Sequence, residues 1–208
     1  MASTPQPWLN PGALAQQLHG AVESILDAAV NRAITDPLPV HNAADVRAAI
    51  RTPAGAGVTT MVVPALASAT RRWTRRIETV GSRLSFTVKA LLAAVPSLAS
   101  SVTLGTRELH ALASLVVNRL RDEGLPVDRR FVQRVAVNAY VWPAGGRPLE
   151  QAQAPASARV AGLWATRPLA REQAGDWVGR AAELIVAADL RHHFERYDAA
   201  PPELGPGS

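Results

Sequence analysis

The residues that could perform metal chemistry lie close together near the C-terminus. Asp189 and His193 are four residues apart, which is the spacing at which one helix face presents two metal ligands. No nearby group of His, Asp or Glu completes such a site, so we expect neither a metal nor a cofactor. The surrounding segment RHHFER, residues 191–196, is interpreted as cationic groups at the C-terminal end of the last helix, where they favour the helix dipole. His192 falls on the apolar side of this helix and is expected at the edge of the core.

The sequence contains no recognisable catalytic motif. No serine occupies a Gly-x-Ser-x-Gly turn, and the chain has no cysteine, which removes disulfides, thiolate ligands and cysteine nucleophiles. His19, His41 and His110 are scattered, and His110 is expected to be partly buried beside an apolar stripe. Four acidic residues are interpreted as caps or solvated pairs at helix ends: Glu108, Asp122, Glu123 and Asp128. We therefore predict no catalytic residue, while an active site assembled from residues far apart in the sequence is left open.

The positive charge is concentrated in the middle third of the chain. The whole sequence has 22 basic and 17 acidic residues, for a net charge of +5. Residues 71–134 carry 12 basic and 5 acidic residues, net +7, whereas residues 1–70 and residues 135–208 each have a net charge of −1. A localised basic region favours an acidic partner, which is nucleic acid, anionic lipid or an acidic protein.

The segment RRWTRR, residues 71–76, belongs to the strongest helical pattern in the sequence, between Pro64 and Pro96. At 100° per residue, the basic side chains share an arc of about 140°. These are the predicted contacts with an acidic partner: Arg71, Arg72, Arg75, Arg76, Arg83 and Lys89. An apolar stripe lies mostly across the helix from them and includes Trp73, Ile77, Val80, Leu84 and Val88. We expect the tryptophan to anchor the helix while the arginines face outward. A stripe left uncovered would need a membrane, a partner or a second copy of the chain.

A second basic region lies on a pair of predicted helices at 106–142. Two helices joined by a glycine turn resemble the helix-turn-helix arrangement, although the turn is longer than usual and such pairs are common in bundles. Four residues are expected on the outer side of the second helix and have side chains that contact nucleic acid: Arg129, Arg130, Arg134 and Asn138. A strand competes here because VAVNAYVW is rich in β-formers, but the cap at Asp128 and the helical neighbours favour a helix.

The elements that would position these residues are helical throughout. A helix is predicted at 11–35, between Asn10-Pro11 and Asp36-Pro37, and a short one follows with Asn42 as its cap. Thr106 is expected to begin a helix that Gly124 ends, and Pro168 to open the last one. The predicted fold is all-α: a single irregular bundle of four to six amphipathic helices, with a long basic helix near 65–95 and loose termini. One helical domain would span 11–196, with linkers near 52–57 and 143–158 and disordered ends at 1–10 and 197–208.

The sequence does not favour a membrane-spanning segment. The uncharged runs 52–70 and 90–106 contain prolines, glycines and hydroxyl side chains, and a helix with arginines on one face belongs at an interface or on a core. No signal peptide is recognised, so a cytoplasmic protein is expected, either free or peripheral to a membrane. We predict a non-enzymatic helical interaction protein whose basic helix docks on an acidic surface, an anionic membrane or an acidic protein. The alternative is nucleic-acid binding through 106–142 and 71–89. A basic face that is simply solvated is the third interpretation.

Overall fold

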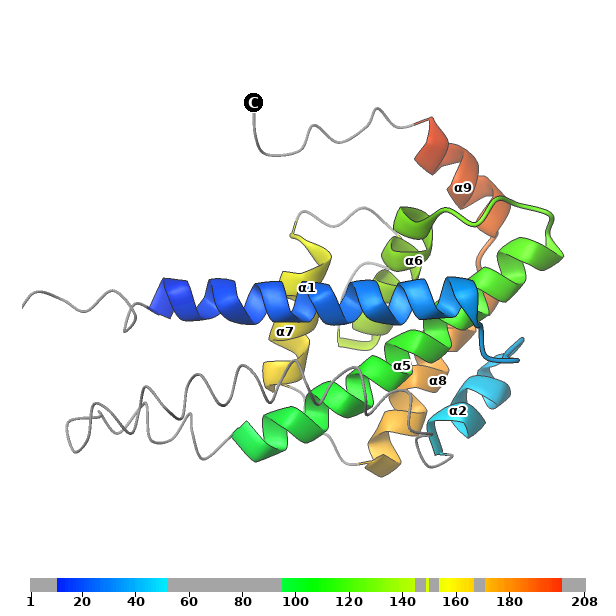
Figure 1. Ribbon diagram of the computed structural model, residues 1–208. Coiled ribbons are helices and arrows are strands. Elements are labelled where there is room, and N and C mark those ends of the chain that lie inside the picture. The colour runs from blue at the N-terminus through cyan, green and yellow to red at the C-terminus, as the bar shows by residue number, and fades with distance from the viewer. Residues whose placement is uncertain (1–10, 52–94, 145–148, 150–153, 167–170, 200–208) are drawn as a thin grey trace, which may run out of the picture.

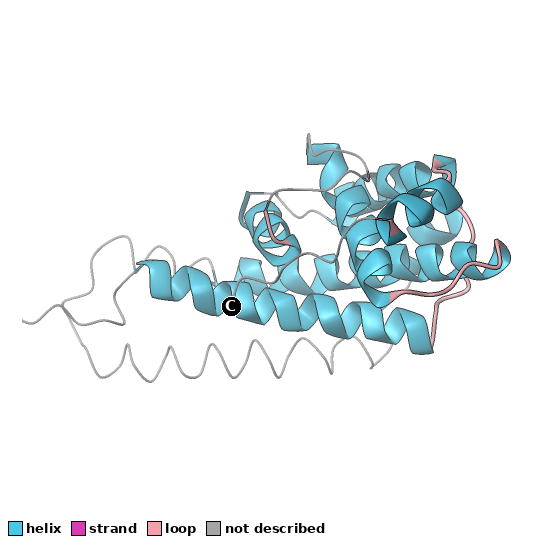
Figure 2. Ribbon diagram, turned by 90° about the horizontal axis from the view of Figure 1, so that it is seen from above, coloured by secondary structure: helices cyan, strands magenta, loops and turns pink. Residues whose placement is uncertain are grey.

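The computed structural model describes residues 11–51, 95–144, 149, 154–166 and 171–199, and each of its regular elements is helical (Figures 1 and 2). In chain order these are α1 (Pro11–Thr35), α2 (Ala43–Arg51), α5 (Val95–Asp122), α6 (Arg129–Val141), the 3-10 turn η3 (Trp142–Ala144), α7 (Ala156–Thr166), α8 (Arg171–Ala187) and α9 (Leu190–Asp198). No strand occurs within these ranges, so the prediction of an all-α bundle is confirmed, and residues 129–141 form a helix rather than a strand.

The ends of the first two helices follow the predicted capping residues. α1 spans the predicted 11–35, and the side chain of Asn42 accepts hydrogen bonds from the backbone N–H groups of Ala44 and Asp45 at the start of α2. The carboxylate of Asp45 in turn accepts from the N–H of His41. The two bonds to Asn42 satisfy donors that the first turn of a helix leaves without an intrahelical acceptor.

α5 begins at Val95 and not at Thr106, so the predicted start was wrong. Pro96 lies in the first turn of α5, where a missing N–H costs no intrahelical hydrogen bond. The predicted end is confirmed. Gly124 has a φ of 67°, its N–H donates to the carbonyl of Arg121, and the N–H of Leu125 donates to the carbonyl of Leu120. This pair of bonds is the Schellman arrangement, which glycine adopts without steric cost.

α5 is the central helix of the described structure. It packs against α1, α2, α6, α7 and α8, and Figure 1 shows it running diagonally behind α1. Every residue from Leu104 to Asn118 is buried. The sequence predicted one apolar stripe on this helix, but neighbours cover it on all sides. Six polar or charged side chains of α5 consequently lie inside the bundle: Thr106, Arg107, Glu108, His110, Ser114 and Asn118.

The C-terminal third differs from the prediction at two places. The range of the expected linker, 143–158, overlaps η3 at its start and α7, which begins at Ala156, at its end. The expected last helix is two helices, because the chain breaks at Asp189, whose side chain accepts from the N–H of His192 and caps α9. The segment 191–196 therefore spans most of α9, and only Arg196 lies in the last turn of the helix, so the prediction of cations at a helix C-terminus holds for Arg196 alone.

Several predictions lie outside the described residues. They include the basic helix near 65–95 before Val95, the loose N-terminus 1–10 and the linker 52–57. The acidic-partner contacts Arg71, Arg72, Arg75, Arg76, Arg83 and Lys89 and the apolar residues Trp73, Ile77, Val80, Leu84 and Val88 lie there as well. The disordered tail was predicted to begin at residue 197, but Tyr197 and Asp198 belong to α9. Within the described ranges, no helix combines the length and the apolar character needed to cross a membrane.

Candidate functional site

A buried chain of hydrogen bonds joins α5, α6 and α7. The hydroxyl of Tyr140 donates to Oε2 of Glu108 over 2.7 Å, and Nε1 of Trp164 donates to the same hydroxyl over 3.1 Å. Glu108 and Tyr140 are fully buried, and Trp164 is 3% exposed. The indole lies directly against the backbone of Gly105, where a Cβ atom would overlap with Nε1 of the ring. A polar chain of this kind fixes the position of α7 on the two helices because each buried group needs its partner.

Glu108 was assigned by sequence to a helix end with a solvated partner, and that assignment was wrong. The residue is in the middle of α5 because the helix begins at Val95. A signal was present in the sequence: the apolar residues from Leu109 to Val117 occur on every side of the helix rather than on one stripe. A carboxyl group next to such a run is expected to lie in the core with a hydrogen-bond donor beside it.

Asn138 of α6 is also buried, at 1% exposure, so its predicted place on the outer side of that helix was wrong. Its Oδ1 accepts a hydrogen bond from Nη1 of Arg159 on α7 over 2.5 Å. Burial lowers the pKa of Arg159 from its usual value. On the other side of α6, Nε1 of Trp177 donates to the carbonyl of Tyr140. An asparagine held inside the bundle in this way has no route to a base edge.

The three arginines predicted with Asn138 have different surroundings. Arg129 is half-exposed and forms an ion pair of 2.5 Å with Asp27 of α1. Arg130 is exposed. Arg134 is partly buried, and its guanidinium carbon lies 4.4 Å from the ring centre of Tyr197 and 5.4 Å from that of Phe131. Arg134 therefore contacts α9 and does not share one exposed face with Arg129 and Arg130.

α9 rests on α6 through aromatic side chains. The ring of Phe131 contacts those of Phe194 and Tyr197 edge to face, with ring centres 4.9 Å and 5.5 Å apart. Tyr197 has a raised pKa because of burial and then the charge of Asp128, which also accepts its hydrogen bond. We call the outer face of this contact the α6–α9 surface, and it consists of Arg130, Arg134, His192, His193, Phe194, Arg196 and Tyr197.

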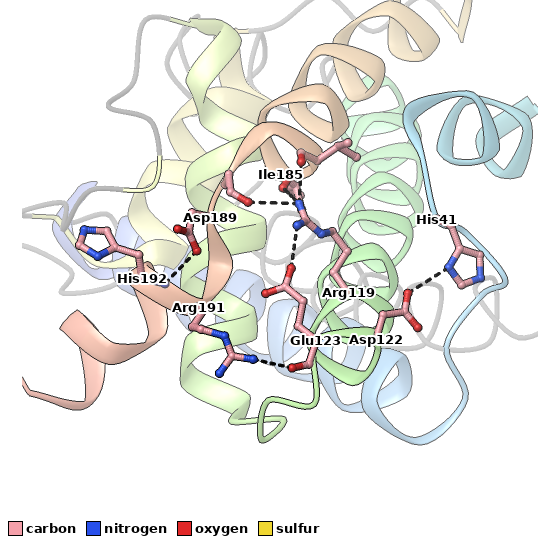
Figure 3. A network of polar contacts seen from close by, with 10 residues as sticks. His41, Arg119, Asp122, Glu123, Ile185, Asp189, Arg191 and His192 are labelled. Atoms are coloured by element: carbon pink, nitrogen blue, oxygen red, sulfur yellow. Dashed lines mark hydrogen bonds and ion pairs between the residues drawn. The ribbon is translucent and has the colours of Figure 1, made fainter.

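The histidines of the α6–α9 surface are placed differently from the prediction. His192 is exposed rather than at the edge of the core, and its imidazole points away from the polar contacts around it (Figure 3). Its ring centre lies 6.1 Å from that of His193. Burial lowers the pKa of His193, and the positive charges of His192, Arg134 and Arg196 lower it further, while Asp189 raises it. Two arginines and two imidazoles from α6 and α9 therefore lie close together.

Side chains at the C-terminal end of α5 form hydrogen bonds with the segments that connect other helices (Figure 3). Nη1 of Arg119 donates to three carbonyls at the end of α8 and beyond, those of Ile185, Val186 and Ala188. Its Nη2 pairs with Glu123, whose backbone carbonyl accepts from Arg191 of α9. The amide of Asn118 donates to the carbonyls of Leu38 and Val40 in the turn between α1 and α2. Apart from the ion pair between Arg119 and Glu123, each of these contacts satisfies a backbone carbonyl, so their role is structural.

His110 of α5 is a further titratable group inside the bundle. It is 4% exposed, and among the described residues its Nε2 meets no hydrogen-bond partner. Burial, followed by the positive charge of Arg32, lowers the pKa of His110 to about 4, while the charge of Asp36 and a backbone hydrogen bond with it oppose the shift. The imidazole is consequently neutral at physiological pH. The expectation of partial burial understated how deeply it lies.

Metal-binding chemistry finds no support in the part of the chain that the structure describes, where no three His, Cys, Asp or Glu side chains gather closely enough to hold an ion. Asp189, one of the two candidate ligands, caps α9. Comparison with known proteins gives no further guidance: no protein-family model, no curated protein and no solved structure matches this chain.

Proposed function

We propose that this protein is a non-enzymatic helical interaction protein that docks on an anionic membrane surface through its arginine-rich middle third. The observation that carries the proposal is the distribution of charge along the sequence. Residues 71–134 have a net charge of +7, while the two flanking parts of the chain each have −1. Six of these basic residues lie between 71 and 89, on one arc of the predicted helix.

The energy available from such a segment is sufficient for reversible binding. Each basic side chain near an anionic bilayer contributes about 1 kcal/mol, so six of them correspond to a dissociation constant well below the millimolar range. The attraction decays over about 10 Å at 0.1 M salt, and docking is therefore expected to weaken as salt is added. Trp73, on the apolar stripe of the predicted helix, has the amphipathic ring that membrane interfaces favour.

The nucleic-acid alternative draws less support from the described residues. Asn138 is buried, Arg129 pairs with Asp27, and the guanidinium of Arg134 lies against Tyr197. A helix that reads bases needs such side chains to project from one exposed face into the groove. Only Arg130 of the four predicted contacts is both exposed and outside the contacts just named. The lipid surface is therefore the partner that we propose.

The proposal is tested by vesicle flotation. The wild-type protein should float with vesicles containing phosphatidylglycerol at about 50 mM salt, and should lose this association at high salt or with phosphatidylcholine alone. Arg72→Glu/Arg76→Glu should weaken binding at least about tenfold, since each reversal removes one attraction and adds one repulsion.

A matched control reverses two exposed arginines outside the basic third, as Arg51→Glu/Arg180→Glu, which changes the net charge by the same amount. Binding within about twofold of the wild type is expected for this control. Equal losses in the two variants would indicate attraction to net charge alone and would contradict docking through the 71–89 segment. Absence of wild-type flotation at low salt would overturn the membrane proposal, and a salt-sensitive shift of duplex DNA by the same sample would transfer support to the alternative.

A further inference from the structure

We propose that the α6–α9 surface is a second contact with the anionic phospholipid surface, and that it engages when His192 and His193 take up protons and disengages near neutral pH. This inference rests on the membrane docking proposed above. It concerns a different part of the molecule, which the structure describes, and it adds a pH dependence that the 71–89 segment alone does not provide.

The geometry gathers the required groups on one surface. His193 is close enough to His192 and Arg196 on its own helix, and to Arg134 on α6, for their charges to lower its pKa. Arg130 stands one turn before Arg134 and is close enough to influence Tyr197. Arg130, His192 and Arg196 are exposed, whereas Arg134 and His193 are partly buried. A phosphate group approaching this surface would therefore meet cations contributed by two helices.

The charge balance explains why the histidines decide the outcome. Residues 128–134 and 189–198 together contain five arginines and four carboxylates, and Arg129 also pairs with Asp27 of α1, so the net charge of this group is zero when both imidazoles are neutral. Protonation of both raises it to +2. Two of the carboxylates are engaged as helix caps, Asp128 on α6 and Asp189 on α9. The surface is thus close to neutral when both imidazoles are neutral and cationic when both are protonated.

The groups that face His193 make its charge depend on an anion. Burial, His192, Arg134 and Arg196 all disfavour its protonated form, and Asp189 favours it. A lipid phosphate placed among these cations would relieve the repulsion between them. Because binding and protonation are then linked, the membrane favours the charged imidazole and the charged imidazole favours the membrane.

The aromatic residues of this surface favour lipid over nucleic acid. Base stacking needs a free ring face. One face of Tyr197 is covered by Arg134, and Phe194 and Tyr197 both contact Phe131 edge to face. Phe194 and Tyr197 are half-buried rings, and Tyr197 carries a polar hydroxyl, so they match the amphipathic side chains that occupy the interface between water and lipid.

The test measures the affinity of the full-length protein for phosphatidylglycerol vesicles at pH 7.5 and pH 5.5, since the lipid phosphate stays ionised at both. Charge added to the imidazoles at pH 5.5, which the lipid phosphate favours, should strengthen wild-type binding by at least about tenfold. In His192→Gln/His193→Gln this gain should fall to less than about twofold. In His192→Arg/His193→Arg the affinity at pH 7.5 should approach that of the wild type at pH 5.5. His41→Gln, an exposed histidine between α1 and α2, is the matched control and should keep the full gain.

The outcomes separate this inference from the proposed function. A wild-type affinity that is equal at the two pH values, or a gain that the glutamine pair retains, overturns the proton-gated contact but leaves docking through residues 71–89 intact. A gain that depends on the histidines but is unaffected by Arg72→Glu/Arg76→Glu supports the α6–α9 surface and contradicts the role of the other segment. The arginine pair decides the case if the glutamine pair misfolds, because a folded arginine variant no tighter than the wild type at pH 7.5 overturns the inference. No binding at either pH, or the same pH dependence with duplex DNA alone, overturns both proposals.

Discussion

The hydroxyl of Tyr140 donates a hydrogen bond of 2.7 Å to the carboxyl group of Glu108, and both side chains are fully buried on different helices. The same hydroxyl accepts from the indole of Trp164, so a single oxygen atom links α5, α6 and α7. Buried polar groups that depend on one another in this way specify how helices pack, because every alternative packing leaves at least one of them without a partner.

Tyr140→Phe should destabilise the protein by about 1–3 kcal/mol. The substitution preserves the ring but removes a donor to Glu108 and the acceptor of the Trp164 N–H. Urea unfolding followed by circular dichroism measures the change. Tyr197→Phe, at a half-buried phenol on α9, should cost less and provides the control. A loss below about 0.5 kcal/mol in Tyr140→Phe would show that the hydroxyl does not hold the three helices together.

Gly105→Ala should destabilise the protein although alanine is the better helix former. A Cβ atom added at this position would lie 2.6 Å from Cε2 and 2.9 Å from Cζ2 of Trp164 and would overlap with Nε1, and the ring has no room to move in the core. Overpacking typically costs about 1–3 kcal/mol, against a gain in helix propensity of about 1 kcal/mol. Gly20→Ala in α1 is the matched control, since an added Cβ there meets nothing within 4 Å and should stabilise the protein. If both substitutions changed the stability in the same direction, the close approach of α7 to α5 would be contradicted.

Local signals in the sequence were sufficient to predict the helical fold. Asn42, Asp128 and Gly124 mark helix ends through hydrogen bonds or backbone angles that involve only neighbouring residues. The bounds of α1 and α6 follow from such signals. The start of α5 was misplaced at Thr106 and the break before α9 was missed, because a proline in the first turn and an aspartate cap fit more than one local arrangement.

The buried polar groups could not be predicted with the same success, because they depend on which helices surround α5. Glu108 and Asn138 were placed at exposed positions by a single-stripe pattern. That pattern holds for a helix with one covered face and fails for a central helix. The contact between Arg134 and Tyr197 joins residues from helices that the sequence gives no reason to pair. Tertiary neighbours, rather than local propensity, determine such sites.

Arg119→Lys should loosen the end of α8 and the start of α9. The guanidinium donates to the carbonyls of Ile185, Val186 and Ala188 and also pairs with Glu123, which a single ammonium group cannot reproduce. We expect a loss of about 1–2 kcal/mol in stability and faster amide exchange in residues 183–193. Arg180→Lys, at an exposed position of α8, should leave exchange unchanged. Unaltered exchange in Arg119→Lys would contradict its role in fixing this connection.

His110 should make the protein less stable as the pH falls from about 6.5 towards 4. Its pKa is lowered to about 4 in the folded protein, from an ordinary value of 6.5, by burial and then by Arg32. Between these values the unfolded chain binds a proton that the folded protein excludes, so stability is full above pH 6.5 and falls by about 1.4 kcal/mol per pH unit below it. His110→Leu should remove this slope in urea unfolding measured between pH 7.5 and 4.5, whereas His41→Gln should retain it. Equal pH slopes for the wild type and His110→Leu would show that the buried imidazole does not control acid stability.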